Sequence, residues 1–337
     1  MRRDNCFDFL RFLFALNVVL GHLTVIAVVP ALQSLRGCFD TYLSVTGFFV
    51  ISGFLIAQSY ERSTLKSYFI KRAKRLLPAY VFVVLCCTFG LVTLTTLPAK
   101  DYFCSAEVWK YLGANLCFLN FLHPSLPGVF ENELINDTSV NPALWTLKIE
   151  VGFYLIVPLL MLWLRRTQRL WLVLASIYVA AVVYRVGLGY WGVASDNATA
   201  TFLARQLPGF MSYFAVGMAG YIYKDRLLQY KHYLIIPALL IFAIERYIDV
   251  EIMTPVAWGI VVLWCAYSLR ALNNFAKYGD ISYGIYIYHA PVLKILLSVG
   301  CFTALPLPAA SAVYVMLVCG LGLLSWHLLE KRVLQRK

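Results

Sequence analysis

The feature of this sequence that most restricts its fold is a series of apolar stretches, each about as long as a membrane is thick. A helix needs about 20 apolar residues to cross the hydrocarbon core of a bilayer. Ten stretches bounded by charged residues approach or reach this length: 8–29, 40–59, 76–98, 143–164, 170–190, 203–223, 233–248, 252–272, 281–301 and 306–329. We therefore predict an all-α fold, a polytopic membrane helix bundle with about ten transmembrane helices, of which 233–248 is the shortest and weakest.

Composition and length agree with this prediction. Hydrophobic residues make up 61% of the 337-residue chain and charged residues only 14%, whereas an average soluble domain has about 25% charged residues. Ten spans with short connections use nearly the whole chain, so we expect one integral membrane domain over 1–337. No small-residue cleavage site follows the first apolar stretch, which we therefore expect to remain as a helix.

The distribution of Lys and Arg predicts the orientation of the chain. The formal net charge is +12, and cytoplasmic loops of membrane proteins carry an excess of basic residues. With both termini cytoplasmic, 20 basic residues fall in cytoplasmic segments and only Arg36, Lys100 and Lys110 in outer ones. We expect this positive charge to interact with the lipid bilayer and not with nucleic acid. The longest outer segment is 99–142, in which 109–122 is too short to span and is predicted to be interfacial or re-entrant.

The sequence indicates neither a metal site nor a nucleotide-binding loop. Nine cysteines are scattered without a Cys-x-x-Cys pair or a His/Cys cluster, so we expect no metal and no disulfide framework. No glycine pattern of a phosphate-binding or dinucleotide-binding loop occurs. The function must therefore be sought in the ionisable residues within the apolar stretches.

Two ionisable residues share one face of the first predicted helix. Arg11 and His22 are eleven residues apart, which is almost three helical turns and a separation of about 16 Å. An ionisable group inside a membrane is costly unless it faces a polar interior. We place Arg11 near the cytoplasmic mouth of a cavity and His22 in the outer half of the membrane. The plainer alternative is that His22 only hydrogen-bonds to a neighbouring helix.

Glu150 is predicted to lie at the same depth as His22. It is about seven residues, or about 10 Å, inside the outer end of the helix at 143–164. An imidazole is the usual group for accepting a proton near neutral pH, and a carboxylate can orient it and stabilise its charged form. We therefore expect His22 and Glu150 to meet as a catalytic pair.

A basic segment precedes the third predicted helix. We read 66–75 as a cytoplasmic loop rich in Lys and Arg, and two interpretations are open. The basic residues could serve topology and attraction to anionic headgroups alone. Alternatively, Arg72 and Arg75, on one helical face, form a clamp for the phosphates of a nucleotide-bearing donor. Arg11 at the same mouth favours the clamp.

Two further segments combine small or polar residues with apolar surroundings. Small residues in 47–54 allow close approach of helices or of a ligand to the backbone. Ser282, Tyr286 and His289 follow the i, i+4, i+7 spacing of one helical stripe. Tyrosines at the start of this helix could form only an interfacial belt, whereas His289 is predicted to contact the donor or to support another site residue.

Together these segments resemble the acyltransferase-3 family of integral membrane acyltransferases over the whole chain. The motifs that carry the resemblance are Arg11-x10-His22, Phe48-Phe49-Val50-Ile51-Ser52-Gly53, Arg72-x-x-Arg75, Trp145-Thr146-Leu147-Lys148-Ile149-Glu150 with Phe153, Tyr154 and Pro158, and Gly279-Asp280-Ile281-Ser282-Tyr283 with Tyr286 and His289. Each motif is weak alone, but their order and their membrane positions are specific.

The resemblance implies a multi-pass enzyme of the bacterial inner membrane. It implies an O-acyltransferase that moves an acyl group, usually acetyl, from acetyl-CoA in the cytoplasm to a hydroxyl of a cell-envelope carbohydrate on the outer side. The donor's phosphates would be held by Arg11, Arg72 and Arg75. His22 would be the catalytic base or would carry the acyl group, with Glu150 orienting it. The tunnel or the acyl group would be contacted by Ser52, Ser282, Tyr286 and His289.

Three features separate this sequence from many relatives. Phe12 stands where Gly is common, and Thr146 where Ser is common. Some members of this family carry an extracytoplasmic hydrolase-like domain after the last helix; we expect none here, which favours a lipid-linked O-antigen, capsule or exopolysaccharide unit over peptidoglycan as the acceptor. A homodimer is left open. The alternative function is a secondary transporter of an anionic or sugar substrate, but the internal repeat typical of transporters is not found.

Overall fold

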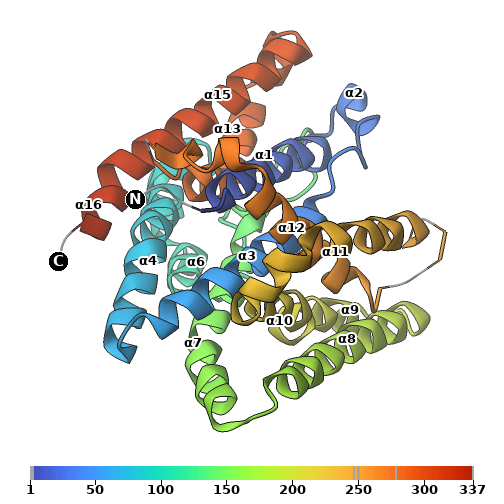
Figure 1. The fold of residues 1–337 in the computed structure, drawn as a ribbon. Coiled ribbons are helices and arrows are strands. Elements are labelled where there is room, and N and C mark those ends of the chain that lie inside the picture. Colours follow the sequence, from blue (N-terminus) through green and yellow to red (C-terminus); the bar gives the residue numbers. More distant parts are fainter. Residues whose placement is uncertain (1–3, 246, 249–250, 278, 336–337) are drawn as a thin grey trace. The chain divides into compact units, whose positions relative to one another are not determined.

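The computed structural model describes residues 4–245, 247–248, 251–277 and 279–335, and within these it is helical (Figure 1). The longer helices are α1 (Phe7–Ile26), α3 (Thr41–Glu61), α4 (Leu65–Gly90), α6 (Ala106–Leu116), α7 (Trp145–Arg166), α8 (Leu170–Ala194), α10 (Leu207–Ile222), α11 (Lys224–Glu245), α12 (Thr254–Ser268), α13 (Ser282–Ser298) and α15 (Leu307–Ser325). Short ones are α2 (Pro30–Gln33), α5 (Ala99–Cys104), α9 (Ala198–Ala204), α14 (Cys301–Ala304), α16 (Lys331–Gln335) and the single turns η1 (Leu91–Thr93), η2 (Pro142–Leu144), η3 (Arg270–Leu272), η4 (Phe275–Lys277) and η5 (Trp326–Glu330). The described residues contain no strand, which confirms the all-α prediction.

Several of these helices are long and apolar enough to cross a membrane. Among the described residues seven pass this test, and an eighth is added if α12 and the turns after it, bent by 72°, are one span. The helices α10, of 16 residues, and α13, of 17, are shorter. The chain is thus a multi-pass membrane protein, while the count of ten spans and the cytoplasmic termini stay predictions. The segment 109–122, expected to be interfacial or re-entrant, overlaps α6 (Ala106–Leu116), whose 11 residues are too few to span.

Two helices begin earlier than the sequence predicts. The basic segment 66–75 was expected to be a loop, but it forms the first turns of α4. Lys and Arg are good helix formers, and the Thr64 hydroxyl accepts a hydrogen bond from the Ser67 amide at this helix start (3.3 Å). Likewise α11 begins at Lys224, nine residues before the predicted start. In both cases hydropathy locates the apolar stretch but misses its polar helical extension.

Helices α1, α3, α4 and α7 contribute to both of the two compact units into which the chain divides. Unit 1 comprises residues 1–10, 45–69 and 149–275, and unit 2 comprises 11–44, 70–148 and 276–337.

Unit 2 is built around α13. Fourteen of its 17 residues are buried, and it packs side by side with α15 (Figure 1). A Cβ on Gly284 of α13 would lie 2.7 Å from the Cα of Gly322 on α15, so this close packing requires glycine. The Tyr283 hydroxyl donates to the Leu76 carbonyl of α4 (2.8 Å). Side chains of α13 therefore reach the neighbouring helices directly.

Unit 1 has a core of aromatic rings and two closely spaced glycine contacts. Phe153 of α7 stacks on Phe214 of α10, with ring centroids 4.0 Å apart. A Cβ on Gly53 of α3 would lie 2.2 Å from the Phe214 carbonyl oxygen, and one on Gly217 of α10 would lie 2.1 Å from the Val50 carbonyl oxygen. Small residues let the backbones of α3 and α10 approach each other, as is common between membrane helices.

We predict that Gly217→Ala destabilises the protein. The added methyl group would push α3 and α10 apart, and overpacking of this kind costs about 1–3 kcal/mol. The measurement is the fraction of detergent-solubilised protein that stays monodisperse after heating. The matched control is Gly187→Ala on α8, where an added Cβ meets no atom within 4 Å. Equal heat resistance of Gly217→Ala and wild type would contradict the assigned contact.

Candidate active site

Arg11 and His22 lie on α1 and belong to the same compact unit, unit 2. Arg11 Nη1 donates to Asp280 Oδ2 (2.9 Å), just before α13 begins. His22 meets His289, nine residues further along the chain and inside α13. Because both contacts advance in the same order along the two segments, α1 and α13 run side by side in the same direction.

Asp280 pairs with two arginines that lie on different helices. Its Oδ2 accepts hydrogen bonds from Arg11 of α1 and from Arg75 of α4. Its Oδ1 accepts from the Ser282 hydroxyl (2.5 Å) and from the Ser282 amide (3.2 Å). Arg75 also lies 3.5 Å from the buried carboxylate of Glu330. These residues form a cluster that we call the arginine cluster: Arg11, Arg75, Asp280 and Glu330.

The arginine cluster keeps Asp280 ionised. Burial alone would raise the pKa of the Asp280 carboxyl, but the charges of Arg11 and Arg75 and the hydrogen bonds from Ser282 hold that pKa well below its usual range. A lowered folded-state pKa contributes stability that is fully present above about pH 4, the unfolded value. This contribution is lost only as the pH falls through the lower folded pKa. The ion pairs are therefore intact at neutral pH.

The position just before Asp280, residue 279, requires a glycine. Its φ is +149°, and a Cβ there would lie 2.4 Å from the Trp326 ring. Both the backbone conformation and the space exclude a side chain. Asp280 can therefore reach the two arginines because the residue before it passes directly against Trp326.

The histidine pair has a defined hydrogen-bonding direction. His289 Nδ1 lies 2.7 Å from the Tyr286 carbonyl oxygen, and a carbonyl can only accept, so Nδ1 of His289 carries a proton. His289 Nε2 lies 2.7 Å from His22 Nδ1. In neutral His289 this Nε2 has a lone pair and accepts from Nδ1–H of His22. The lone pair of neutral His22 is therefore on Nε2.

The two histidines differ in exposure. His289 is fully buried in unit 2, whereas His22 is partly exposed. His22 is thus the more accessible member of the pair.

Glu150 and Ser52 are brought together in unit 1. The Ser52 hydroxyl donates to Glu150 Oε1 (3.0 Å), which joins α3 to α7. The sequence predicts a meeting of His22 and Glu150. Because His22 belongs to unit 2 and Glu150 to unit 1, that meeting stays a prediction. In unit 2 the observed partner of His22 is His289.

The remaining predicted residues have partners within their own unit. Arg72 lies on α4, three residues and about one turn before Arg75, in the segment that was expected to be a loop. The Tyr286 hydroxyl hydrogen-bonds to the Thr146 hydroxyl (2.8 Å). Ser282 bonds to Asp280. The roles of Ser52, Ser282 and Tyr286 in binding the donor stay predictions.

Sequence reasoning quoted Asp280 only within a motif and gave it no role, and it missed Glu330 and the contacts of Lys294. Asp280 is an acidic residue in a predicted cytoplasmic segment that is otherwise basic, and this contrast is the signal that could have singled it out. Lys294, fully buried on α13, donates to the Asp137 carbonyl (2.5 Å) and to the Ser139 carbonyl in the long segment before α7. No local pattern links these positions, because they are 157 and 155 residues apart.

No three His, Cys, Asp or Glu side chains among the described residues are grouped so that they could hold a metal ion. The expected absence of a metal stays a prediction.

Comparison with known proteins places these contacts in a family. A family model described as an acyltransferase domain matches residues 4–327. The chain is 26% identical to an O-acetyl transferase of Shigella phage Sf6 over all of this chain and 98% of that protein. It is 29% identical to nodulation protein 10 of Rhizobium leguminosarum bv. viciae, over 88% of this chain and 84% of that protein. A putative acetyltransferase, ORF330, of Acidianus two-tailed virus is 25% identical over 86% of this chain and 84% of its own length.

No solved structure matches the chain. Because the family model covers nearly all of the sequence, from residue 4 to residue 327, the chain belongs to the acyltransferase-3 family.

Proposed function

We propose that this protein transfers an acyl group, most simply acetyl, from acyl-CoA in the cytoplasm to a hydroxyl of a cell-envelope polysaccharide or lipid-linked glycan unit outside a bacterial inner membrane. The observation that carries the proposal is the pairing of α1 with one segment, 280–289, at two points: Arg11 with Asp280 and His22 with His289. One helix thus presents a cationic end and, about 16 Å further on, a base. Family membership favours this enzyme over a transporter.

The arginine cluster is the proposed site for the donor's diphosphate. Guanidinium groups bind phosphate oxygens with two parallel hydrogen bonds, which gives both strength and orientation. Arg11 and Arg75 share one carboxylate oxygen of Asp280, and Arg72 is one turn away. Asp280 acts as the counter-ion that holds the two guanidinium groups in place while no phosphate is bound. An incoming phosphate then competes with Asp280 for these groups.

His22 is the proposed catalytic residue. As the acceptor hydroxyl oxygen attacks the thioester carbonyl carbon, His22 Nε2 takes the hydroxyl proton. The new C–O bond forms, the C–S bond breaks, and the proton passes from His22 to the leaving thiolate of CoA. In the alternative route Nε2 itself attacks and carries the acyl group before the acceptor does. Both routes need the lone pair on Nε2, and they differ in whether an acylated His22 can be recovered without acceptor.

His289 is the proposed positioning residue. Its Nε2 accepts from Nδ1–H of His22, and its own Nδ1–H is anchored on the Tyr286 carbonyl. This selects the His22 tautomer whose lone pair is on Nε2, a role that a carboxylate has in many hydrolases. Glu150 is then left to stabilise the positive charge that His22 acquires when it takes the proton.

The acceptor is proposed to enter beside the long segment before α7. Buried Lys294 ties Asp137 and Ser139 of this segment to α13, five residues beyond His289. In the predicted topology this segment is outside, so the histidine pair would be open to the acceptor from the outer side. A lipid-linked O-antigen, capsule or exopolysaccharide unit fits this direction of transfer.

Replacement of His22 is the central test. We predict that His22→Ala abolishes acylation of the surface glycan, because no other group supplies the Nε2 lone pair. Ester-bound acetyl on purified glycan is measured by mass spectrometry, and immunoblotting of membranes shows that the variant accumulates. His232→Ala, an exposed histidine on α11, is the control and should keep wild-type acylation. Full acylation by His22→Ala would refute the mechanism.

A substitution of Arg75 distinguishes the two interpretations of the basic segment, phosphate binding and membrane topology. We predict that Arg75→Lys, which keeps the charge and therefore the orientation of the chain, raises the KM for acetyl-CoA about tenfold or more. The reason is that Lys cannot form the forked pair of bonds, and a charge-assisted hydrogen bond contributes about 1.5–3 kcal/mol. Purified protein is assayed with varied acetyl-CoA, and Lys66→Arg serves as the control in the same helix. An unchanged KM in Arg75→Lys would favour the topological interpretation.

The positioning role of His289 is tested by measuring whether its replacement changes kcat or KM. We predict that His289→Ala lowers kcat roughly 100-fold, within the range for loss of general base catalysis, and leaves the KM for acetyl-CoA unchanged. His289→Gln offers a carbonyl oxygen to Nδ1–H of His22 and should recover part of kcat. If Ala and Gln variants have the same kcat, the proposed hydrogen-bonding direction is wrong.

A further inference from the structure

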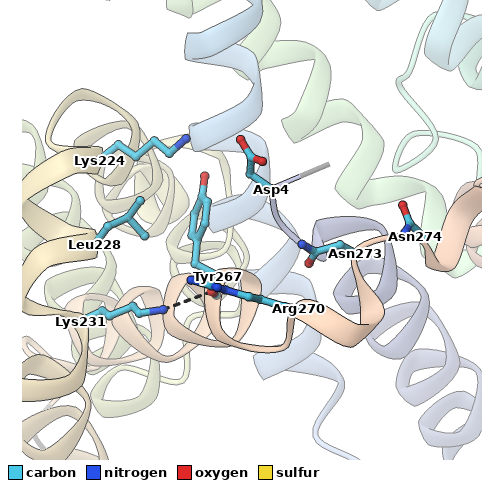
Figure 2. A pocket seen from close by; sticks show the side chains of 8 residues that line it. All are labelled: Asp4, Lys224, Leu228, Lys231, Tyr267, Arg270, Asn273 and Asn274. Atoms are coloured by element: carbon cyan, nitrogen blue, oxygen red, sulfur yellow. Dashed lines mark hydrogen bonds between the residues drawn. The ribbon is translucent and has the colours of Figure 1, made fainter. Parts of the chain in front are cut away.

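Unit 1 contains a pocket that the acyl-transfer proposal does not use. Its volume is about 620 Å³, within the range of about 300–1,000 Å³ for small-molecule sites. Figure 2 shows side chains around it from the first turns of α11, from the end of α12 and the turns after it, and from the N-terminal segment. The lining residues are Asp4, Lys224, Leu228, Lys231, Tyr267, Arg270, Asn273 and Asn274.

The pocket is cationic. Three basic side chains face one carboxylate, that of Asp4, among the described lining residues, so two positive charges are in excess. Lys224 Nζ lies 5.2 Å from the centre of the Tyr267 ring. Lys231 Nζ donates to the Tyr267 carbonyl (3.1 Å) and to the Ser268 hydroxyl (3.2 Å), which caps the end of α12.

Topology alone does not explain this arrangement. The segments that carry Lys224, Lys231 and Arg270 are predicted to be cytoplasmic, where basic residues are expected. The positive-inside rule, however, concerns only the side of the membrane on which each charge lies. It does not require three cations from two segments to surround one concave space beside an aromatic ring and two asparagine amides.

We propose that this pocket binds a phosphate monoester, separately from the arginine cluster. A monoester carries a charge of about −1.5 to −2 near pH 7, which matches the excess of two positive charges. Arg270 and Lys224 supply charge-assisted hydrogen bonds, while Lys231 stays on the end of α12. Two sources have this chemistry: the 3′-phosphate of CoA in the cytoplasm, and the headgroup of phosphatidic acid in the membrane.

The test is binding by the full-length purified protein with Lys224→Gln and Arg270→Gln combined. Lys231 is left unchanged because of its bonds to the end of α12. The soluble probes are CoA and dephospho-CoA, which lacks the 3′-phosphate, measured by calorimetry. The membrane probe is a nanodisc containing phosphatidic acid, with retained lipid measured by native mass spectrometry. Arg226→Gln, an exposed cation on the same helix that does not line the pocket, is the matched control.

We expect the double variant, and not the control, to weaken one of the two probes about tenfold or more. Weaker CoA binding with unchanged dephospho-CoA binding assigns the pocket to the nucleotide, and lost lipid retention assigns it to the headgroup. Asp4→Asn, which removes the opposing charge, should strengthen binding of the same probe, an effect that misfolding cannot produce. Unchanged affinities for CoA and for lipid in the double variant would overturn the proposal. These readouts do not measure acyl transfer, so their failure and failure of the proposed function are distinguishable.

Discussion

The structure of this protein depends on the cost of placing charge in an apolar environment. A buried ion without a partner costs several kcal/mol, so each buried ion must be paired, and the pairing determines which segments meet. The Asp280 carboxylate can be largely shielded from water, with 11% of its side chain exposed, because Arg11 and Arg75 face it, and this joins α1 and α4 to the segment before α13. Lys294 can be buried because the segment before α7 provides two carbonyls and a carboxylate. The few ions of a mostly apolar chain therefore position α13, and α13 positions the histidine pair.

Much of the fold could be predicted from the sequence, because hydropathy and helical periodicity are local properties. The all-α class, the apolar stretches and the placement of Arg11 and His22 on one helix follow from residues close together in the chain. The start of α4 could not be predicted, because its first turns are basic and hydropathy treats them as a loop. The division of the predicted span 203–223 into two helices could not be predicted either. The backbone leaves the helical conformation between α9 and α10, and Pro208 lies in the first turn of α10.

The candidate site could be predicted only residue by residue. The cost of an ion inside a membrane singled out Arg11, His22 and His289 as candidate residues, and each has a polar partner in the structure, but that cost does not identify the partners. The phosphate clamp was predicted from Arg11, Arg72 and Arg75 alone, and the structure adds a carboxylate, that of Asp280, which pairs with Arg11 and Arg75. A carboxylate was expected to orient His22, and the structure adds a second imidazole, that of His289, 267 residues away in the sequence and 2.7 Å from His22 Nδ1. Such pairs depend on tertiary contacts that no spacing rule contains.

The hydrogen-bonded chain through the histidine pair has a consequence for the membrane that holds it. Protons hop along linked rings and hydroxyls, and a chain of such groups from one face to the other would leak protons and dissipate a gradient. Here the chain runs from His22 Nδ1 through His289 and stops at the Tyr286 carbonyl, which accepts a hydrogen bond but has no proton to hand on. The Tyr286 carbonyl oxygen thus ends the proton pathway. His22 can exchange its proton with a substrate, while proton transfer past His289 along this chain is blocked.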